Sequence, residues 1–229
     1  MVSVLNLCNS RKSAHHMSRK LFLVRHGETE WNREGRIQGV LDSPLTNEGM
    51  IQARRNAGIL KSMLVKRLIA SPLGRAAKTA NIIAEETGAR CEFDERLKER
   101  DCGTWGGMTW DEAERSHPEI WHARSENPYG FTPPGGESLA DLEPRIRTML
   151  AELELGGELA LVTHGITMRV LLRCLLELDT REVSRIRCPN HIVYEVTLDA
   201  IEAHCQHYLN GEGPYDGLLL SVPGVMSRH

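Results

Sequence analysis

The chain has 229 residues, 41% of them hydrophobic, with a formal net charge of −3 and a pI near 6.4. This size and apolar content predict one larger domain with a sizeable core and exclude an intrinsically disordered chain. The slight negative charge argues against nucleic acid or an anionic membrane as a general partner. No apolar run approaches the roughly 20 residues that a membrane span needs.

The cysteines and the N-terminus bear on the compartment. Six cysteines are scattered without a C-x-x-C pair, so we expect free thiols in a reducing cytoplasm. Residues 1–18 lack an apolar secretory signal and are expected to be a flexible tail. An organelle-targeting segment or an upstream start stays open for this tail. Residues 19–229 are expected to form a single domain.

Strand and helix signals alternate along most of the chain. Short apolar runs predict buried strands at residues 21–25, 67–70 and 158–163, with a weaker strand at 90–93. Spacing of apolar residues and capping signals predict helices over about 46–65, 74–87 and 166–178, and one that starts at Ser138. Pro144 is expected to kink that last helix or delay its start.

Two further signals complete the pattern. Thr109 and Glu112 form a capping box for a short helix, and residues 191–198 and 201–208 read as a hairpin around Asp199 and Ala200. Together these elements predict an α/β fold, a three-layer α/β/α sandwich around a mostly parallel sheet. In such sheets, ligands gather beyond the carboxyl ends of the strands.

Three of the predicted strands end in similar chemistry. The first ends in Arg25-His26-Gly27, the second leads into a turn that contains Arg75, and the third ends in His164-Gly165. If these strands are parallel neighbours, two guanidiniums and two imidazoles converge at one edge of the sheet. Arginine pairs bind phosphate through charge-assisted hydrogen bonds, and an imidazole is a competent nucleophile at phosphorus. A single such residue is more often structural, but three matched strand ends indicate a phosphate site.

Six segments give a specific family resemblance. In order they are LVRHGETEWN, GRIQGVLDSPLTNEG, SPLGRAAKTA, LKERDCGTWGG, PPGGESL and VTHG. Together they resemble the histidine phosphatase superfamily, also called the phosphoglycerate mutase-like family, from about Leu21 to about Val196. The resemblance implies a phosphoglycerate mutase-like fold.

The resemblance also implies roles for individual residues. His26 matches the nucleophile that becomes phosphohistidine, and Glu99 matches the acid that protonates the leaving oxygen and then activates water. The residues that match the surroundings of the transferred phosphoryl group are Arg25, Arg75 and His164, with further contacts from Asn32 and the Gly165 backbone. Gln38 and Gly39 match a loop on the substrate side. No metal and no cofactor are implied, because fixed cations take their place.

The resemblance covers both phosphatases and mutases, and the segment 103–134 bears on the choice. A phosphoglycerate mutase needs extra cations for a carboxylate, and this insert holds only Arg115 and Arg124 against five acidic residues. We therefore predict a metal-independent phosphatase that hydrolyses a small phosphomonoester through phospho-His26. The alternatives are a cofactor-dependent phosphoglycerate mutase and, second, a non-catalytic phosphate-binding module. The aromatic residues of the insert could line the leaving-group side or pack the insert onto the domain; they are Trp105, Trp110, Trp121, Tyr129 and Phe131.

The remaining expectations concern partners. The expected partner is a small-molecule phosphate ester, without nucleic acid or membrane, and a homo-oligomer stays open. His204 and His207 are separated by three positions on a predicted strand, so they point to opposite faces and are not expected to bind a metal.

Overall fold

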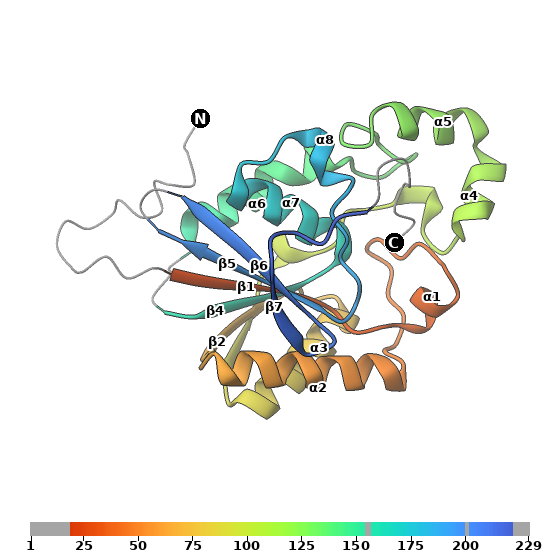
Figure 1. Ribbon diagram of the computed structural model, residues 1–229. Coiled ribbons are helices and arrows are strands. Elements are labelled where there is room, and N and C mark those ends of the chain that lie inside the picture. The colour runs from red at the N-terminus through yellow and green to blue at the C-terminus, as the bar shows by residue number, and fades with distance from the viewer. Residues whose placement is uncertain (1–18, 154–156, 200–201, 222–229) are drawn as a thin grey trace.

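The computed structural model describes residues 19–153, 157–199 and 202–221. It contains a seven-stranded sheet of order β3-β2-β4-β1-β5-β6-β7, with helices on both faces (Figure 1). The strands are β1 Arg19–Arg25, β2 Arg67–Ala70, β3 Arg90–Phe93, β4 Leu159–Thr163, β5 Ile192–Leu198, β6 Ala203–Leu209 and β7 Glu212–Asp216. Strands β3, β2, β4 and β1 pair in parallel, and β5 to β7 continue the sheet in antiparallel fashion. The predicted α/β sandwich is confirmed.

Two helical layers cover the sheet. Helices α2 (Asn47–Ser62) and α3 (Gly74–Thr87) lie on one face, and α6 (Leu139–Glu152) and α7 (Gly165–Leu176) lie on the other (Figure 1). Thr46 caps α2 and Ser138 caps α6, as their sequence positions predict. Helix α6 begins directly at Leu139 and continues through Pro144, so the proline does not delay its start.

The central strands are buried on both faces. In β1, Leu21 and Leu23 contact the core beneath α6 and α7, whereas Phe22 and Val24 contact the core beneath α2 and α3. This division follows from the alternation of side chains along a strand. Because β1 is locked between two cores, the residues at its end are held in a fixed position.

The ends of three strands lie at one level of the sheet. Arg25 pairs with Thr163, and Ala70 pairs with Val162, so β1 and β2 flank β4 in register. The next residues extend this alignment, because the backbone N–H of His26 donates to Thr163 O at 2.9 Å and that of Ser71 donates to Val162 O at 2.9 Å. The expected convergence of the three strand ends is therefore confirmed.

Several short elements were not predicted from the sequence. They are the helices α1 (Glu30–Arg33), α5 (Pro118–Glu126) and α8 (Thr180–Val183) and the strand β7. Helix α1 and helix α8 have only four residues, and α5 has no buried residue, so neither length nor periodicity marks them. The predicted short helix after Thr109 is α4, Trp110–Ser116.

The hairpin of β5 and β6 forms as predicted, although Ala200 in its turn lies outside the described residues, as does the tail 1–18. All described cysteines are free thiols. Among the described residues, no helix combines the length and apolar character that a bilayer crossing requires.

Candidate active site

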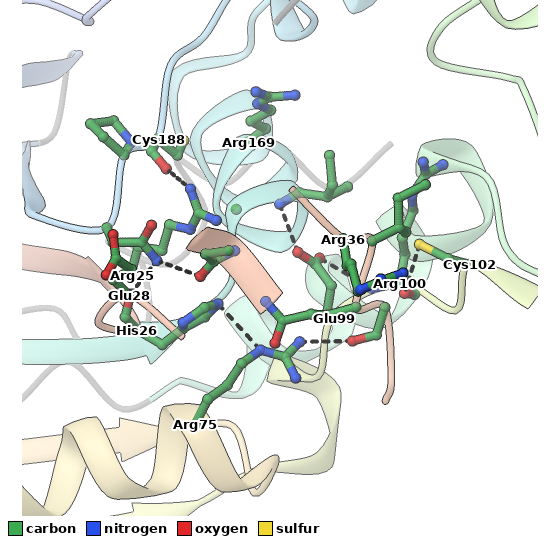
Figure 2. Close-up of a pocket in the computed structure, with 18 of the residues that line it drawn as sticks. Arg25, His26, Glu28, Arg36, Arg75, Glu99, Arg100, Cys102, Arg169 and Cys188 are labelled. Atoms are coloured by element: carbon green, nitrogen blue, oxygen red, sulfur yellow. Dashed lines mark hydrogen bonds between the residues drawn. The ribbon is translucent and has the colours of Figure 1, made fainter. Parts of the chain in front are cut away.

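A cavity of about 430 Å³ opens at the carboxyl ends of β1, β2 and β4 (Figure 2). Eight of the nine predicted site residues line it: Arg25, His26, Asn32, Gln38, Gly39, Arg75, Glu99 and Gly165. The ninth, His164, is fully buried beneath this surface, and its ring centroid lies 5.2 Å from that of His26. Segments separated by more than 130 residues thus meet at one site.

His26 is held with one ring nitrogen available for chemistry. Its Nδ1 lies 2.8 Å from Gly27 O, which can only accept, so Nδ1 carries the proton. Nε2 then has a lone pair, and it accepts a 3.2 Å hydrogen bond from Nε of Arg75. Burial, followed by the charges of Arg75 and Arg25, holds the pKa of His26 well below its usual value. The imidazole is therefore neutral at neutral pH.

Arg75 is fixed by the loop that precedes α2. Its Nη1 donates to Leu41 O at 2.7 Å and to Asp42 at 3.0 Å, and its Nη2 donates to Gly39 O at 2.7 Å. Gly39 has φ +55°, and a Cβ there would lie 2.9 Å from the backbone nitrogen of Cys102. A glycine is thus required for this loop to approach both Arg75 and the Cys102 segment.

Arg25 is the second arginine whose charge acts on His26. Its Nη1 donates to the Cys188 carbonyl, and its Nε is buried without a hydrogen-bond partner among the described residues. Burial lowers the pKa of Arg25 to about 10, so the guanidinium stays charged at neutral pH. A buried charge with an unused N–H is suited to an anionic ligand.

Glu99 is bound at the N-terminus of α7. Its carboxylate accepts hydrogen bonds from the backbone N–H groups of Ile166 and Thr167, each at 3.0 Å, and from the Thr167 hydroxyl at 3.0 Å. The first N–H groups of a helix lack intrahelical partners, so a carboxylate there is oriented firmly. Gly165, the first residue of the same helix, also lines the cavity.

Asn32 and Gln38 lie at the α1 side of the cavity. Asn32 forms a capping box with Thr29 at the start of α1. Gln38 Nε2 donates to the Thr29 hydroxyl at 2.9 Å, whereas its buried Oε1 has no hydrogen-bond partner among the described residues. Gln38 can therefore accept a hydrogen bond from a ligand hydroxyl.

Several residues of the site were missed from the sequence. Ser71 lies 2.7 Å from Nε2 of His164, and Asn190 Nδ2 donates to His26 O at 2.9 Å and to Asn32 at 3.2 Å. Ser71 belongs to the SPLGR segment that was noted for Arg75, so that motif was a usable signal. Asn190 stands in an irregular loop before β5 and carries no such signal.

The cavity is strongly cationic. Its acidic lining consists of Glu28 and Glu99. Five arginines line it in addition to Arg25 and Arg75, namely Arg36, Arg100, Arg124, Arg169 and Arg187. Only Arg124 comes from the insert, so counting charges in residues 103–134 underestimated the cations near the site. Arg100 directly follows Glu99 in the chain and is buried, and its Nη1 donates to Glu137 O at 3.4 Å.

The insert packs mainly on itself. Trp105 is buried against Trp121 and Phe131, and this small core is separate from the two that flank the sheet. Arg124 stacks over the rings of Trp110 and Trp121, with its Cζ 5.0 and 4.9 Å from their centroids. Of the five aromatic residues considered from the sequence, Trp110 lines the cavity and the others contribute to packing.

The arrangement suits a tetrahedral dianion next to a neutral imidazole. The guanidiniums of Arg75 and Arg25 both act on His26, and the first residue of α7 lines the same cavity. His204 is exposed on β6 and His207 binds Gly217 O, and no group of three metal-ligating side chains occurs among the described residues. The fold and the site therefore define an α/β protein with a phosphate-type anion site at the ends of three parallel strands.

Comparison with known proteins gives the family. The sequence profile of the histidine phosphatase superfamily (branch 1) matches residues 21–210. The chain belongs to this superfamily, as the six segments predicted.

Similar proteins include both activities. The chain is 39% identical over 175 residues, 75% of this chain and 81% of the relative, to a probable phosphoglycerate mutase GpmB of Salmonella choleraesuis. A solved mycobacterial glucosyl-3-phosphoglycerate phosphatase in complex with VO3 is 31% identical, with a TM-score of 0.72 over 78% of this chain and 92% of that one. YhfR of Bacillus stearothermophilus is 28% identical, with a TM-score of 0.70 over 91% and 98%.

Proposed function

We propose that this protein is a metal-independent phosphatase that hydrolyses a small phosphomonoester through a phosphohistidine on His26. The observation that carries the proposal is the state of His26: a neutral ring, with Nδ1 bound to Gly27 O and the Nε2 lone pair facing the cavity arginine Arg75. A mycobacterial phosphatase of similar structure adds support.

The reaction would proceed in two displacements. In the first, Nε2 of His26 attacks phosphorus while the P–O bond to the leaving group breaks, and protonated Glu99 gives its proton to the departing oxygen. In the second, water attacks the phosphohistidine, Glu99 takes its proton, and the P–N bond breaks to release phosphate. Arg25 and Arg75 stabilise the charge on the equatorial oxygens in both steps.

A phosphoglycerate mutase is the second candidate. The name of the Salmonella relative favours it, and so does the cationic lining, because a mutase must bind a carboxylate as well as a phosphate. The arginines that supply this lining come largely from outside the insert. The two activities share the first displacement and differ in the acceptor of the phosphoryl group, which is water in a phosphatase and a second hydroxyl in a mutase.

One experiment tests the proposal. Phosphate release is measured over a panel of phosphomonoesters with EDTA present, beside conversion of 3-phosphoglycerate to 2-phosphoglycerate primed with 2,3-bisphosphoglycerate. We expect release without isomerisation, and acid-labile, base-stable phosphate on His26 after a rapid quench. Isomerisation faster than release would establish the mutase. Absence of both, with His26 unphosphorylated, would favour a non-catalytic binding module.

The control variant is His26→Ala. It should remove turnover and covalent phosphate and leave the circular dichroism spectrum unchanged, because β1 and its neighbours are packed independently of this ring. Retained turnover in this variant would disprove the role of His26.

A further inference from the structure

The second buried histidine of the site, His164, is hydrogen-bonded through its ring to Ser71. Nε2 of His164 lies 2.7 Å from Oγ of Ser71, and both side chains are fully buried. Nδ1 of His164 is buried and has no hydrogen-bond partner among the described residues. The ring lies next to His26, 5.2 Å between centroids.

His164 carries a single ring proton at neutral pH. Burial, followed by the charges of Arg75 and then His26 and Arg25, keeps the pKa of His164 well below its usual value. A neutral imidazole has one N–H and one lone pair, so two tautomers compete. The surroundings of the two nitrogens decide between them.

Hydrogen-bond satisfaction favours the proton on Nδ1. Ser71 Oγ already accepts a 3.3 Å hydrogen bond from the Leu73 N–H, and among the described residues the one acceptor for its own O–H is Nε2 of His164. If Nε2 carried the proton, the Ser71 O–H and the Nδ1 lone pair would both be buried and unsatisfied. If Nδ1 carries it, only that N–H lacks a partner, and buried polar groups without partners are costly.

We propose that Ser71 is a positioning residue that holds His164 in the Nδ1–H tautomer, so that His164 offers an N–H donor to a phosphoryl oxygen beside His26. This inference rests on the proposed function for the identity of the anion. The unpartnered Nδ1–H of the free protein is then explained, because its acceptor arrives with the substrate. Ser71 itself does not line the cavity and acts through His164.

The SPLGRAAKTA segment would thus serve the site at three points. Arg75 binds His26, Ser71 orients His164, and Thr79 accepts the Gly27 N–H at 3.1 Å while it donates to Arg75 O at 2.8 Å. Because the turn after β2 and the first half of α3 carry all three, one short segment contacts both histidines or their neighbours.

The tautomer can be measured without any substrate. Long-range ¹H–¹⁵N spectra of the histidine rings, with His164 assigned by its loss in His164→Gln, should give Nδ1 the shift of a protonated nitrogen and Nε2 that of an unprotonated one. Orthovanadate, which imitates the transferred phosphoryl group, should shift the Nδ1 resonance. A protonated Nε2 in the wild-type protein would overturn the proposal, whatever the enzyme's activity.

Kinetics give an independent readout. Ser71→Ala should lower kcat/KM about 10- to 100-fold, the loss seen when a metal-ligating histidine loses its hydrogen-bond partner, and weaken vanadate inhibition. Ser71→Thr, which keeps the hydroxyl, should recover part of the loss. The matched control is Thr87→Val, which removes a buried hydroxyl at the far end of α3 that donates to Ile83 O. Its kinetics should be unchanged.

The outcomes separate this inference from the proposed function. If kcat/KM and vanadate inhibition are unchanged in Ser71→Ala, the Ser71 hydroxyl has only a structural role, and the inference is contradicted. An inactive wild-type protein whose His164 is protonated at Nδ1 and responds to vanadate would contradict the phosphatase and support the role of Ser71.

Discussion

The two ends of the cavity differ in how their side chains are held. At the His26 end, the functional groups come from the ends of three adjacent strands and are fixed by buried hydrogen bonds. At the opposite end, Trp110 and Arg124 come from two short helices that pack on a separate aromatic cluster. At the first end, the positions of the functional groups are tied to the strands of the sheet. The second can change with little effect on the sheet, so it is the end suited to set substrate preference.

The largest effect is expected at the strand-end site. Arg75→Lys keeps the charge but cannot reproduce hydrogen bonds from three nitrogens to His26, Gly39 and the Leu41–Asp42 segment. We expect kcat/KM to fall about 10²- to 10³-fold. Arg181→Lys, an exposed arginine on α8, is the control and should leave kcat/KM unchanged. A loss below threefold in Arg75→Lys would show that the hydrogen bonds from the three guanidinium nitrogens are not needed.

A smaller, substrate-dependent effect is expected for Glu99→Gln. The amide has the size of the carboxylate, but it can accept only one of the two backbone hydrogen bonds at the N-terminus of α7 and cannot act as the acid that a poor leaving group requires. We expect a loss of about 10²-fold for an alkyl phosphate and much less for nitrophenyl phosphate. Equal losses for both esters would argue against proton transfer by Glu99.

The buried His26 also predicts a dependence of stability on pH. Its pKa in the folded protein lies well below the unfolded value near 6.5, so below that pH the unfolded chain binds a proton that the folded protein excludes. The contribution to stability is complete above about pH 6.5 and declines as the pH falls towards the folded-state pKa, by at most about 1.4 kcal/mol per pH unit. Denaturant unfolding between pH 7 and 5 should show a shallower decline in His26→Gln than in the wild type. The exposed His122 gives the control variant, His122→Gln, which should keep the wild-type slope.

The smallest effect is expected at the insert. Arg124→Gln removes a cation and the stacking on Trp110 and Trp121 while the strand-end site stays intact. We expect an increase of about threefold to tenfold in KM for esters with an anionic leaving group, and little change in kcat for nitrophenyl phosphate. Arg115→Gln, the exposed second arginine of the insert, should have no effect. A large fall in kcat for all esters would remove the distinction between the two ends of the cavity.

The local sequence was sufficient to predict the helices and strands that have a clear hydrophobic pattern, and the site residues that lie in a recognisable motif. The buried strands β1, β2 and β4 have continuous apolar runs, and α2 and α6 have clear caps, so both follow from local preferences. The same motifs pointed to the eight site residues that line the cavity. Helix α5 and strand β7 escaped prediction because they bury few or no side chains and so lack a hydrophobic period.

The amino-acid sequence by itself determined the superfamily, the alternation of strands and helices, and the set of residues that meet at the strand ends. Tertiary structure alone decided the proton positions on His26 and His164, because these depend on Gly27 O, Arg75 and Ser71 being within hydrogen-bond distance. It also decided the charge of the cavity, to which Arg36, Arg100, Arg169 and Arg187 contribute from distant segments. Composition along a segment cannot reveal such groupings, because charge and hydrogen bonding act through space and the chain brings these residues together only when the sheet has formed.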